Sequence, residues 1–498
     1  MHTVVLAAGL FVFVAHLLEV VFERTRIPDI LLLMVLGVLA GEGALNLIPM
    51  ESFGEVGEFL AIVTLAVILF ESGLGLKVKS LLQSAGRAAP FSLLSMVSAI
   101  ACLTVALRFL EGMDWWTALL GGLIMGGTSS AVVIPMVKAL DLGEGTGTVL
   151  TLESTLTDVF CIIGTVGVAV SLAAGDKPLV EKLLGEAGFS LIAACLLGAG
   201  AGLFWSVLLS QADRLASTML TTVAGALVVY GFCEQMGVSG AIATLTFGIT
   251  LGNLPRGVVL RVDRGADAAP IKLKLREVKR VERAVYAEVV FLLKAAFFFY
   301  LGMKVDPGNF LSMAGVVAII LALVPFFPRY PSVRLLLGPK GSSRRDALLA
   351  TVLVPRGLAA AVLAQVPVQL FKKMVESLNS AKVNELKEAA AAGGADFSVK
   401  GYCDAANEVF LKAENTVGLL SEPLPPGCEK FLQADGLADV VAMMVFFSIA
   451  IVSLMVFLVE RGALAAVGQF AFGAYATGED PQAGSPEPEA QTSHTPDS

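Results

Sequence analysis

Apolar runs of about twenty residues recur along most of this sequence. A run of roughly 20 mostly apolar residues is long enough to cross a bilayer as a helix. Apolar residue types, Tyr and Trp included, make up 56% of the 498 residues, charged residues 16%, and mean hydropathy is +0.79. A soluble domain has roughly 45–50% apolar and about 25% charged residues. The sequence therefore predicts an all-α protein that crosses the membrane many times.

Thirteen runs meet this criterion, and the charges between them predict their orientation. The expected spans are 3–22, 27–48, 57–75, 85–107, 117–138, 148–173, 187–209, 217–236, 238–253, 284–303, 309–328, 346–367 and 437–459. Lys and Arg concentrate in the loops that follow odd-numbered spans, above all in 256–283 and 329–345. Loops rich in Lys and Arg stay in the cytoplasm. We therefore expect the N-terminus outside and the C-terminus in the cytoplasm, in the plasma (inner) membrane of a prokaryote.

The expected organisation has four parts. Residues 1–367 form a bundle of twelve spans, 368–436 form a partly helical extracytoplasmic insert, and 437–461 form the last transmembrane helix. Residues 477–498 are rich in Pro, Glu and Ser, a composition typical of disorder. In the insert, Cys403 and Cys428 are candidates for a disulfide, since this segment faces the oxidising side. The basic loop 256–283 contains a helix-like sequence, LKLREVKRVER.

Several function classes do not fit. The formal net charge is −8, and the sequence has no basic cluster of the kind that binds nucleic acid. Because the chain is expected to span the membrane, lipid is an expected partner. The three His are His2, His16 and His494, and none lies in an HExxH pattern. Neither a cofactor nor an enzymatic reaction is therefore expected.

Two expected spans are interrupted near mid-depth. The fifth contains Gly-Gly-Thr-Ser-Ser at 126–130, and the twelfth contains Val-Pro-Arg-Gly at 354–357. They are seven positions apart in the order of spans, an odd number, so they cross the membrane in opposite directions. Discontinuous helices in opposite orientation are the signature of inverted repeats that meet at an ion site. The alternative is that Gly, Ser and Pro only allow close packing or a kink.

The sixth span carries two carboxylates, Glu153 and Asp158. A charged side chain at mid-membrane costs several kcal/mol, so it normally faces a partner or a wet cavity. Residues four apart share a helix face, which groups Ser154 with Asp158 and Glu153 with Thr157. We expect Arg356 to form a structural ion pair with Glu153, because Arg keeps its charge and binds carboxylates bidentately. Asp158 is then left to face the cavity.

Asp158 is the expected binding site for both a proton and a cation such as Na⁺. Burial favours the protonated carboxyl group, whereas a bound cation favours the carboxylate, so the two compete for the same oxygens. Hard oxygen ligands suit an alkali cation. The candidate oxygen ligands beside Asp158 are Ser154, Thr128, Thr157 and Ser129. Such competition produces cation/proton exchange.

Six stretches resemble the monovalent cation/proton antiporter superfamily, especially prokaryotic sodium/proton antiporters related to the animal sodium/proton exchangers. They occur in the family's order, and they are RIPDILLLMVLGVLAGEG (26–43), LFESGLGLKVKSLL (69–82), GGTSSAVVIPMVKAL (126–140), LESTLTDVF (152–160), FFFYLGMKVD (297–306) and VPRGLAAAVLAQVP (354–367). The resemblance implies an elevator-type antiporter, normally a homodimer. It places Asp158 as the ion-carrying aspartate, Thr128 and Ser154 as ligand positions, and Glu153 with Arg356 as the stabilising pair.

This chain departs from the family at two positions. Thr128-Ser129-Ser130 stands where many exchangers have Thr-Asp-Pro, and Thr157 stands where most relatives have Asn or Asp. In relatives with two aspartates, a lysine in span ten pairs with the first. Lys294 resembles that lysine, and it has three alternatives: pairing with Asp158, neutrality through burial, or orientation towards a loop. With one titrating carboxylate, electroneutral one-for-one exchange is the simpler hypothesis.

Other functions stay open at this point. A cation channel or a cation-coupled symporter of another class would also place charged groups in the membrane. A scaffold or sensor that acts through the 368–436 insert is a further alternative. Glu71, in the third span, is interpreted as a helix-end or interface carboxylate in preference to an ion ligand.

Overall fold

The computed structural model describes most of the membrane-embedded chain. The described residues are 2–25, 27–41, 44–46, 54–75, 78–173, 188–211, 218–254, 259–262, 271–274, 280–337, 342–379, 399–400, 402–404 and 428–473. The disordered tail expected at 477–498 therefore lies outside the described residues.

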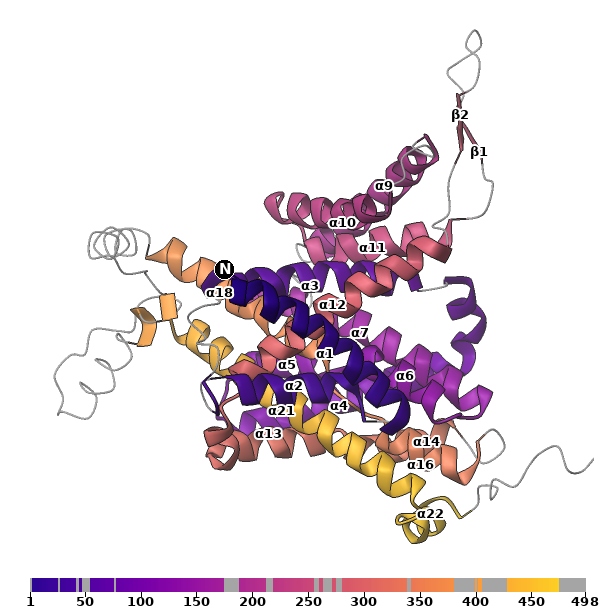
Figure 1. The fold of residues 1–498 in the computed structure, drawn as a ribbon, viewed down its shortest axis with the longest axis vertical. Helices are drawn as coiled ribbons and strands as arrows, with labels where there is room; N and C mark the ends of the chain where they lie inside the picture. The colour runs from indigo at the N-terminus through magenta and orange to yellow at the C-terminus, as the bar shows by residue number, and fades with distance from the viewer. Residues whose placement is uncertain are drawn as a thin grey trace, which may run out of the picture.

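The first half of the chain is a series of helices with short connections (Figure 1). They are α1 (His2–Thr25), α2 (Asp29–Ala40), α3 (Gly54–Gly75), α4 (Val78–Leu110), α5 (Trp115–Gly126), α6 (Ser130–Ala139), α7 (Glu144–Ala173), α9 (Gly188–Gln211), α10 (Thr218–Gln235) and α11 (Gly240–Asn253). A hairpin of β1 (Val259–Val262) and β2 (Ile271–Lys274) follows.

The second half begins at the long helix α12 and ends beyond the last expected span. Its elements are α12 (Arg280–Lys304), η3 (Pro307–Leu311), α13 (Met313–Leu323), α14 (Phe326–Leu336), α16 (Arg344–Val352), α17 (Leu358–Leu363), α18 (Gln365–Leu378), α21 (Cys428–Glu460) and α22 (Ala465–Phe472). Each of the expected spans overlaps one helix or one interrupted helix.

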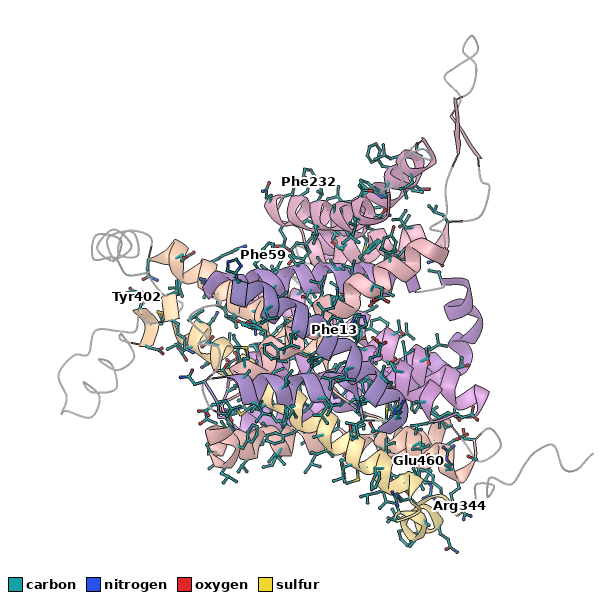
Figure 2. All side chains as sticks on the ribbon, in the orientation of Figure 1. Phe13, Phe59, Phe232, Arg344, Tyr402 and Glu460 are labelled. Atoms are coloured by element: carbon teal, nitrogen blue, oxygen red, sulfur yellow. A yellow bond between two sulfur atoms is a disulfide. The ribbon has the colours of Figure 1, made fainter. Side chains whose placement is uncertain are left out.

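Length and composition support a membrane location. Within the described residues, seven helices or helix pairs are long and apolar enough to cross a bilayer, and three shorter apolar helices accompany them. Large apolar side chains lie on the outer surface, among them Phe13 (80% exposed), Phe59 (67%) and Phe232 (57%) (Figure 2). Such extensive apolar exposure is typical of a surface that faces lipid. How many helices cross the bilayer stays a prediction.

The membrane part is all-helical, as predicted, but the basic loop is not. β1 and β2 pair antiparallel, with Val259 opposite Lys274 and Val262 opposite Ile271. Leu273 and Lys274 were expected in a helix, yet they belong to β2, and helix α12 begins only at Arg280. In β2 the sequence IKLK alternates apolar and basic residues, a period of two that favours strands. Its partner VLRV contains two Val, a residue type with high strand propensity.

Glycines bring α2 against α12 and α3 against α11. A Cβ atom at Gly37 would lie 2.1 Å from the carbonyl oxygen of Phe299, and one at Gly302 would lie 2.3 Å from that of Met34. At Gly248 the same atom would lie 2.3 Å from the carbonyl oxygen of Phe70. Small residues allow membrane helices to approach to backbone contact. These contacts fix the positions of α2, α3 and α12 around the site described below.

The described chain has two distinct sides. In Figure 1 the N-terminus and α18 lie on the left, whereas the β1–β2 hairpin and α22 lie on the right. The hairpin is the basic loop that the charge pattern assigns to the cytoplasm. The cytoplasmic assignment itself stays a prediction.

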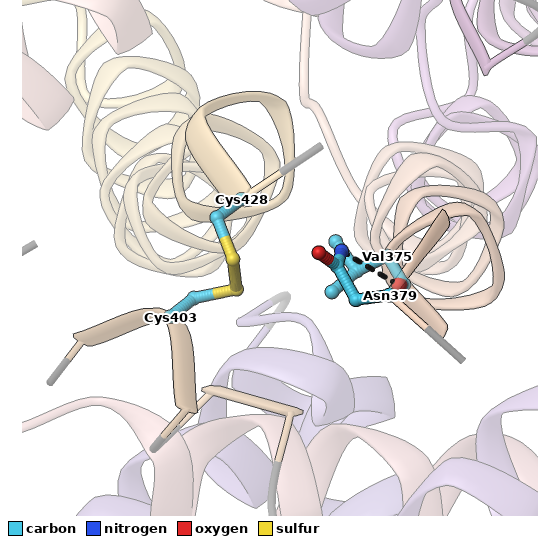
Figure 3. Close-up of a disulfide and its surroundings, with 4 residues drawn as sticks. All are labelled: Val375, Asn379, Cys403 and Cys428. Carbon is cyan, nitrogen blue, oxygen red and sulfur yellow. Dashed lines mark hydrogen bonds between the residues drawn. A yellow bond between two sulfur atoms is a disulfide. The ribbon is translucent and has the colours of Figure 1, made fainter. Parts of the chain in front are cut away.

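The insert is continuous with the helices on either side of it. Helix α18 crosses the expected boundary between residues 367 and 368, and α21 begins at Cys428, ahead of the expected start at residue 437. A disulfide joins Cys403 to Cys428, and both residues are fully buried. Figure 3 shows this disulfide facing the last turn of α18, where Asn379 Nδ2 donates to the carbonyl oxygen of Val375 (2.9 Å).

Candidate functional site

Both expected helix interruptions are present, and they meet. Helix α5 ends at Gly126 and α6 begins at Ser130, while α16 ends at Val352 and α17 begins at Leu358. The backbone N–H of Ser129, in the first break, donates to the carbonyl oxygen of Pro355, in the second (2.8 Å). Non-helical backbone at membrane depth is tolerated where it is buried in protein or lines a cavity. The two breaks therefore form one shared centre.

Arg356 stabilises the end of α5. Its Nη1 donates to the carbonyl oxygen of Gly126 (3.0 Å), the last residue of that helix, and its backbone N–H donates to Ser448 Oγ on α21 (2.9 Å). The carbonyl end of a helix carries partial negative charge, so a guanidinium there is favourable. Arg356 is 1% exposed, so its guanidinium group is directed to the helix end at the break and not to solvent.

Asp158 occupies the opposite position, at the start of α6. Its Oδ2 accepts from Ser130 Oγ (2.6 Å) and from the Ser130 backbone N–H (3.4 Å). The amide end of a helix favours negative charge. Ser130 was not among the residues selected from sequence. Its position as the first residue of the helix after the break was the available signal, because Ser often binds acceptors or backbone groups at helix starts.

A cavity of about 470 Å³ opens beside Asp158. Two oxygen atoms at this cavity, Asp158 Oδ1 and Ser129 Oγ, are buried and have no hydrogen-bond partner in the part of the chain described. Buried polar atoms are nearly always paired, so these two are suited to a bound ligand. The other polar side chains that line the cavity are Glu71, Ser72, Ser130, Thr151, Thr155 and Lys294.

The other expected oxygen ligands do not line this cavity. Thr157 Oγ1 lies 3.2 Å from Thr128 Oγ1, accepts from the Thr128 backbone N–H (3.2 Å) and donates to the Ser154 carbonyl oxygen (3.1 Å). Thr157 therefore links α7 to the first break. Ser154 is fully buried, and its hydroxyl donates to the carbonyl oxygen of Thr151 (3.1 Å). Of the selected residues, Asp158, Ser129 and Lys294 are brought together at the cavity.

The predicted pairing of Glu153 with Arg356 is wrong, because Arg329 binds Glu153. Arg329 Nη2 donates to Glu153 Oε2 (2.8 Å), and Arg329 Nη1 donates to Glu153 Oε1. Ser95 Oγ joins the pair, donating to Glu153 Oε1 (3.1 Å) and accepting from Arg329 Nη1 (2.8 Å). A bidentate guanidinium already occupies both carboxylate oxygens, and Arg356 is directed to α5 instead.

Arg329 was missed because the expected eleventh span ended at residue 328. Arg329 was counted as the first charge of the basic loop 329–345, which the charge pattern assigns to the cytoplasm. The helix continues as α14, where Arg329 is 1% exposed. Its Nε donates to the carbonyl oxygen of Ala350 on α16 (2.9 Å), and its guanidinium lies over the ring of Phe91 (4.7 Å). Glu153 and Asp158 have different partners, Arg329 and Ser130, whereas the different functions expected for the two carboxylates stay a prediction.

The arrangement can hold a small cation. Asp158 and Ser129 both line one cavity, and each has an oxygen atom without a hydrogen-bond partner among the described residues. Carboxylate and hydroxyl oxygens are hard donors suited to alkali ions. The described residues contain no group of three or more His, Cys, Asp or Glu side chains of the kind that holds a metal ion firmly. A sparse set of oxygens is compatible with an ion that must leave again.

Comparison with known proteins finds K(+)/H(+) antiporters among the relatives of this chain. The K(+)/H(+) antiporter NhaP2 of Shewanella sp. (strain ANA-3) is 28% identical over 260 residues, which cover 50% of this chain and 44% of that protein. The K(+)/H(+) antiporter NhaP of Alkalimonas amylolytica is 24% identical over 369 residues, covering 73% and 60% respectively. The match thus spans less than half of the first relative's length.

A solved structure has the same fold. The sodium proton antiporter MjNhaP1 from Methanocaldococcus jannaschii superimposes with a TM-score of 0.58 at 18% identity, over 96% of this chain and 99% of that chain. The family model described as sodium/hydrogen exchanger, transmembrane, matches residues 9–385, which is most of the sequence. The chain therefore belongs to the transmembrane sodium/hydrogen exchanger family.

Proposed function

We propose that this protein exchanges a monovalent cation for a proton by binding the two in turn at Asp158. The observation that carries the proposal is the pair of unpartnered oxygens, Asp158 Oδ1 and Ser129 Oγ, at a cavity beside the helix breaks. A cation bound there is coordinated by the carboxylate, and a proton on the same carboxylate removes its charge. Since both use Asp158, only one is carried at a time.

Ser130 acts as a positioning residue in this scheme. Its hydroxyl and backbone N–H hold Asp158 Oδ2, which leaves Oδ1 directed to the cavity. Ser129 supplies the second oxygen. Ser154, Thr128 and Thr157, which do not line the cavity, are proposed to support the site from the layer of residues next to it. Glu153 with Arg329, and Arg356 with Gly126, hold the surrounding helices.

Alternating access is proposed to follow an elevator mechanism. The thirteen helices contain inverted repeats, and the two broken helices move together as part of one core. The Ser129–Pro355 hydrogen bond supports this joint motion because it ties one break to the other. A homodimer would provide the stationary part against which the core moves. The protein would act in the prokaryotic plasma membrane, where it serves pH and cation homeostasis.

The transported cation is proposed to be Na⁺, K⁺ or Li⁺. Relatives at 24% and 28% identity bear the name K(+)/H(+) antiporter, whereas MjNhaP1 is named a sodium proton antiporter. The oxygen donors at the cavity suit all three ions. One-for-one exchange is proposed, because Thr157 stands beside Asp158 in place of a second carboxylate.

Reconstituted transport tests this function. Purified protein in proteoliposomes should release protons when Na⁺, K⁺ or Li⁺ is added, and Asp158→Asn should abolish the signal, a loss of at least about 100-fold. Glu288→Gln is the matched control: it removes a carboxylate from α12 that lies on the exposed surface beside His16 (3.7 Å). Equal transport by wild type and Asp158→Asn would refute the proposal.

The same vesicles separate the alternatives. A channel would conduct the cation without proton release, and a symporter would require a second solute. A membrane potential generated by exchange would contradict the one-for-one stoichiometry while leaving the antiporter assignment intact.

A further inference from the structure

Lys294 lies between two cavities. It lines the 470 Å³ cavity that holds Asp158 and Glu71, and it also lines a second cavity of about 150 Å³ that holds Asp29. Ala131 and Pro135, both on α6, are the other residues common to the two linings. The Lys294 side chain thus forms part of the wall between them.

The position of this lysine is fixed by backbone packing. Lys294 is on α12, which contacts α2 at Gly37 and Gly302, and α2 begins at Asp29. Glu71 is on α3, which also packs against α12. Lys294, Asp29 and Glu71 therefore lie on three closely packed helices, with α12 between the other two.

The ammonium group of Lys294 has two electrostatic partners and no close one. It interacts with the carboxylates of Glu71 and Asp29. Among the described residues, no hydrogen bond or ion pair shorter than 4.0 Å is recorded for it. The three alternatives raised by the sequence thus give way to a fourth: one positive charge shared by two carboxylates, neither of which is Asp158.

A charge inside a membrane protein needs compensation, and its field extends well beyond contact distance. Shared between two cavities, the ammonium neutralises Glu71 on one side and Asp29 on the other. Together with Glu19, which also lines the small cavity, the two cavities hold three carboxyl groups and one ammonium group before Asp158 is counted. Without the ammonium, the large cavity would attract cations more strongly and hold them longer.

We propose that Lys294 is a specificity-determining residue that weakens cation binding at Asp158 and limits the large cavity to one monovalent cation. It acts through its charge, and Asp29 moderates that charge from the second cavity. This inference rests on the proposed exchange of a cation at Asp158. In this scheme Asp29, in the small cavity, partly offsets the positive charge of Lys294 and so changes the electrostatic potential at the ion site.

The test compares Lys294→Met, which keeps an unbranched side chain without charge, with Lys294→Arg, which keeps the charge. Lys294→Met should bind Na⁺ or K⁺ about three- to tenfold more tightly, as expected for loss of a unit charge at intermediate range. Lys294→Arg should stay close to wild type. The readouts are the KM for the cation in proteoliposomes and the rise in melting temperature with cation concentration in detergent. Lys294→Gln serves the same comparison where the Met variant does not accumulate.

A double-mutant cycle tests the role of Asp29. Asp29→Asn alone should weaken cation binding, because the ammonium is then less compensated, and combined with Lys294→Met it should have little effect. Unchanged or weaker cation binding in both neutral variants of Lys294, or strictly additive effects with Asp29→Asn, would overturn the inference. Failure of the exchange proposal shows itself separately, as wild-type vesicles that do not release protons.

Discussion

Arg329 and Arg356 are both 1% exposed, yet their guanidinium groups have different partners. Arg329 binds the carboxylate of Glu153, whereas Arg356 binds the carbonyl oxygen at the end of α5. The first joins α7 to α4, α14 and α16, and the second joins the two breaks. At the scale of the residue, a buried arginine here identifies a junction between helices.

Removing one partner of the Glu153–Arg329 pair should be strongly destabilising. Arg329→Met leaves Glu153 buried without its counter-charge, a change that costs about 3–5 kcal/mol. Replacing both partners, as in Glu153→Leu with Arg329→Met, should recover most of that loss, because an apolar pair needs no compensation. Thermal melting of the purified protein in detergent measures both effects.

Arg356→Met is the control for the assignment of this pair. Its effect on the melting temperature should couple to replacement of Glu153 much less than that of Arg329→Met does. Among the described residues no hydrogen bond joins Arg356 to Glu153, and their charges interact only at longer range. Strong coupling of Glu153 to Arg356, with none to Arg329, would restore the pairing predicted from sequence.

The charged groups could be recognised from sequence, but their partners could not. Glu153, Asp158 and Arg356 attract attention as soon as they are placed in apolar spans. Arg329 does not, because it stands as the first charge of the basic loop 329–345. Pairing depends on side-chain direction and helix rotation, which the spacing of Glu153 and Arg356 in sequence does not contain.

At the scale of the element, the interrupted helices were predictable because Gly, Pro and Ser stand at mid-depth in both. Their contact was less so. Gly357 allows close approach: a Cβ atom there would lie 2.4 Å from Ser129 Oγ. The glycine of the second break therefore leaves room for a candidate ligand of the first.

Gly357→Ala should damage transport more than folding. The added methyl group displaces Ser129 Oγ from the cavity, so the KM for the cation should rise by about tenfold, equivalent to the loss of one good polar contact. Transport assays over a range of cation concentrations measure this change. The matched control is Gly231→Ala on α10, where a Cβ atom meets nothing within 4 Å.

Equal KM values for the two glycine variants would show that the space around Ser129 is not used by the ion. A Gly357→Ala protein that fails to accumulate, beside a normal Gly231→Ala protein, would indicate that the glycine serves packing only.

At the scale of the whole molecule, residues 400 and 403 of the insert are joined to the first turns of α21, the helix that continues from the insert into the bundle. The Cys403–Cys428 disulfide is one such link, and an ion pair between Lys400 Nζ and Asp435 Oδ2 (2.5 Å) is another. Lys430 Nζ donates to the carbonyl oxygen of Leu172, at the end of α7 (2.9 Å). The Lys430 hydrogen bond connects the start of α21 with α7, the helix that carries Asp158.

Loss of the disulfide should lower stability without abolishing transport. The bonded cysteines are 25 residues apart, a separation for which the loop-entropy relation gives about 3.5 kcal/mol. Cys403→Ser with Cys428→Ser, or treatment of the wild type with a reductant, should lower the melting temperature by several degrees. Serine replacement of the buried Cys161 and Cys233 is the control for loss of thiols alone. A double variant that melts like the wild type would contradict this role.

The ion pair at Lys400 should persist under alkaline conditions. Burial would lower the pKa of the Lys400 ammonium, but the hydrogen bond and charge of Asp435 outweigh it and raise the pKa above its usual value. Its contribution to stability is therefore complete below the pKa of lysine in the unfolded chain. That contribution is lost only as pH rises through the higher folded value. Because the Lys400 side chain is 53% exposed, the contribution is small.

Thr157 has a consequence for what such an exchanger can achieve. Its hydroxyl links α7 to the first break and carries no charge, so Asp158 is left as the one proposed carrier at this pair of positions. Trading one cation for one proton moves no net charge, and the membrane potential then neither drives nor opposes the cycle. Transport stops when the cation ratio across the membrane equals the proton ratio, about tenfold for each unit of pH difference. The cation concentration in the cell would thus be set by the pH difference across the membrane alone. Vesicles with the same pH difference should reach the same cation ratio whether or not a membrane potential is applied.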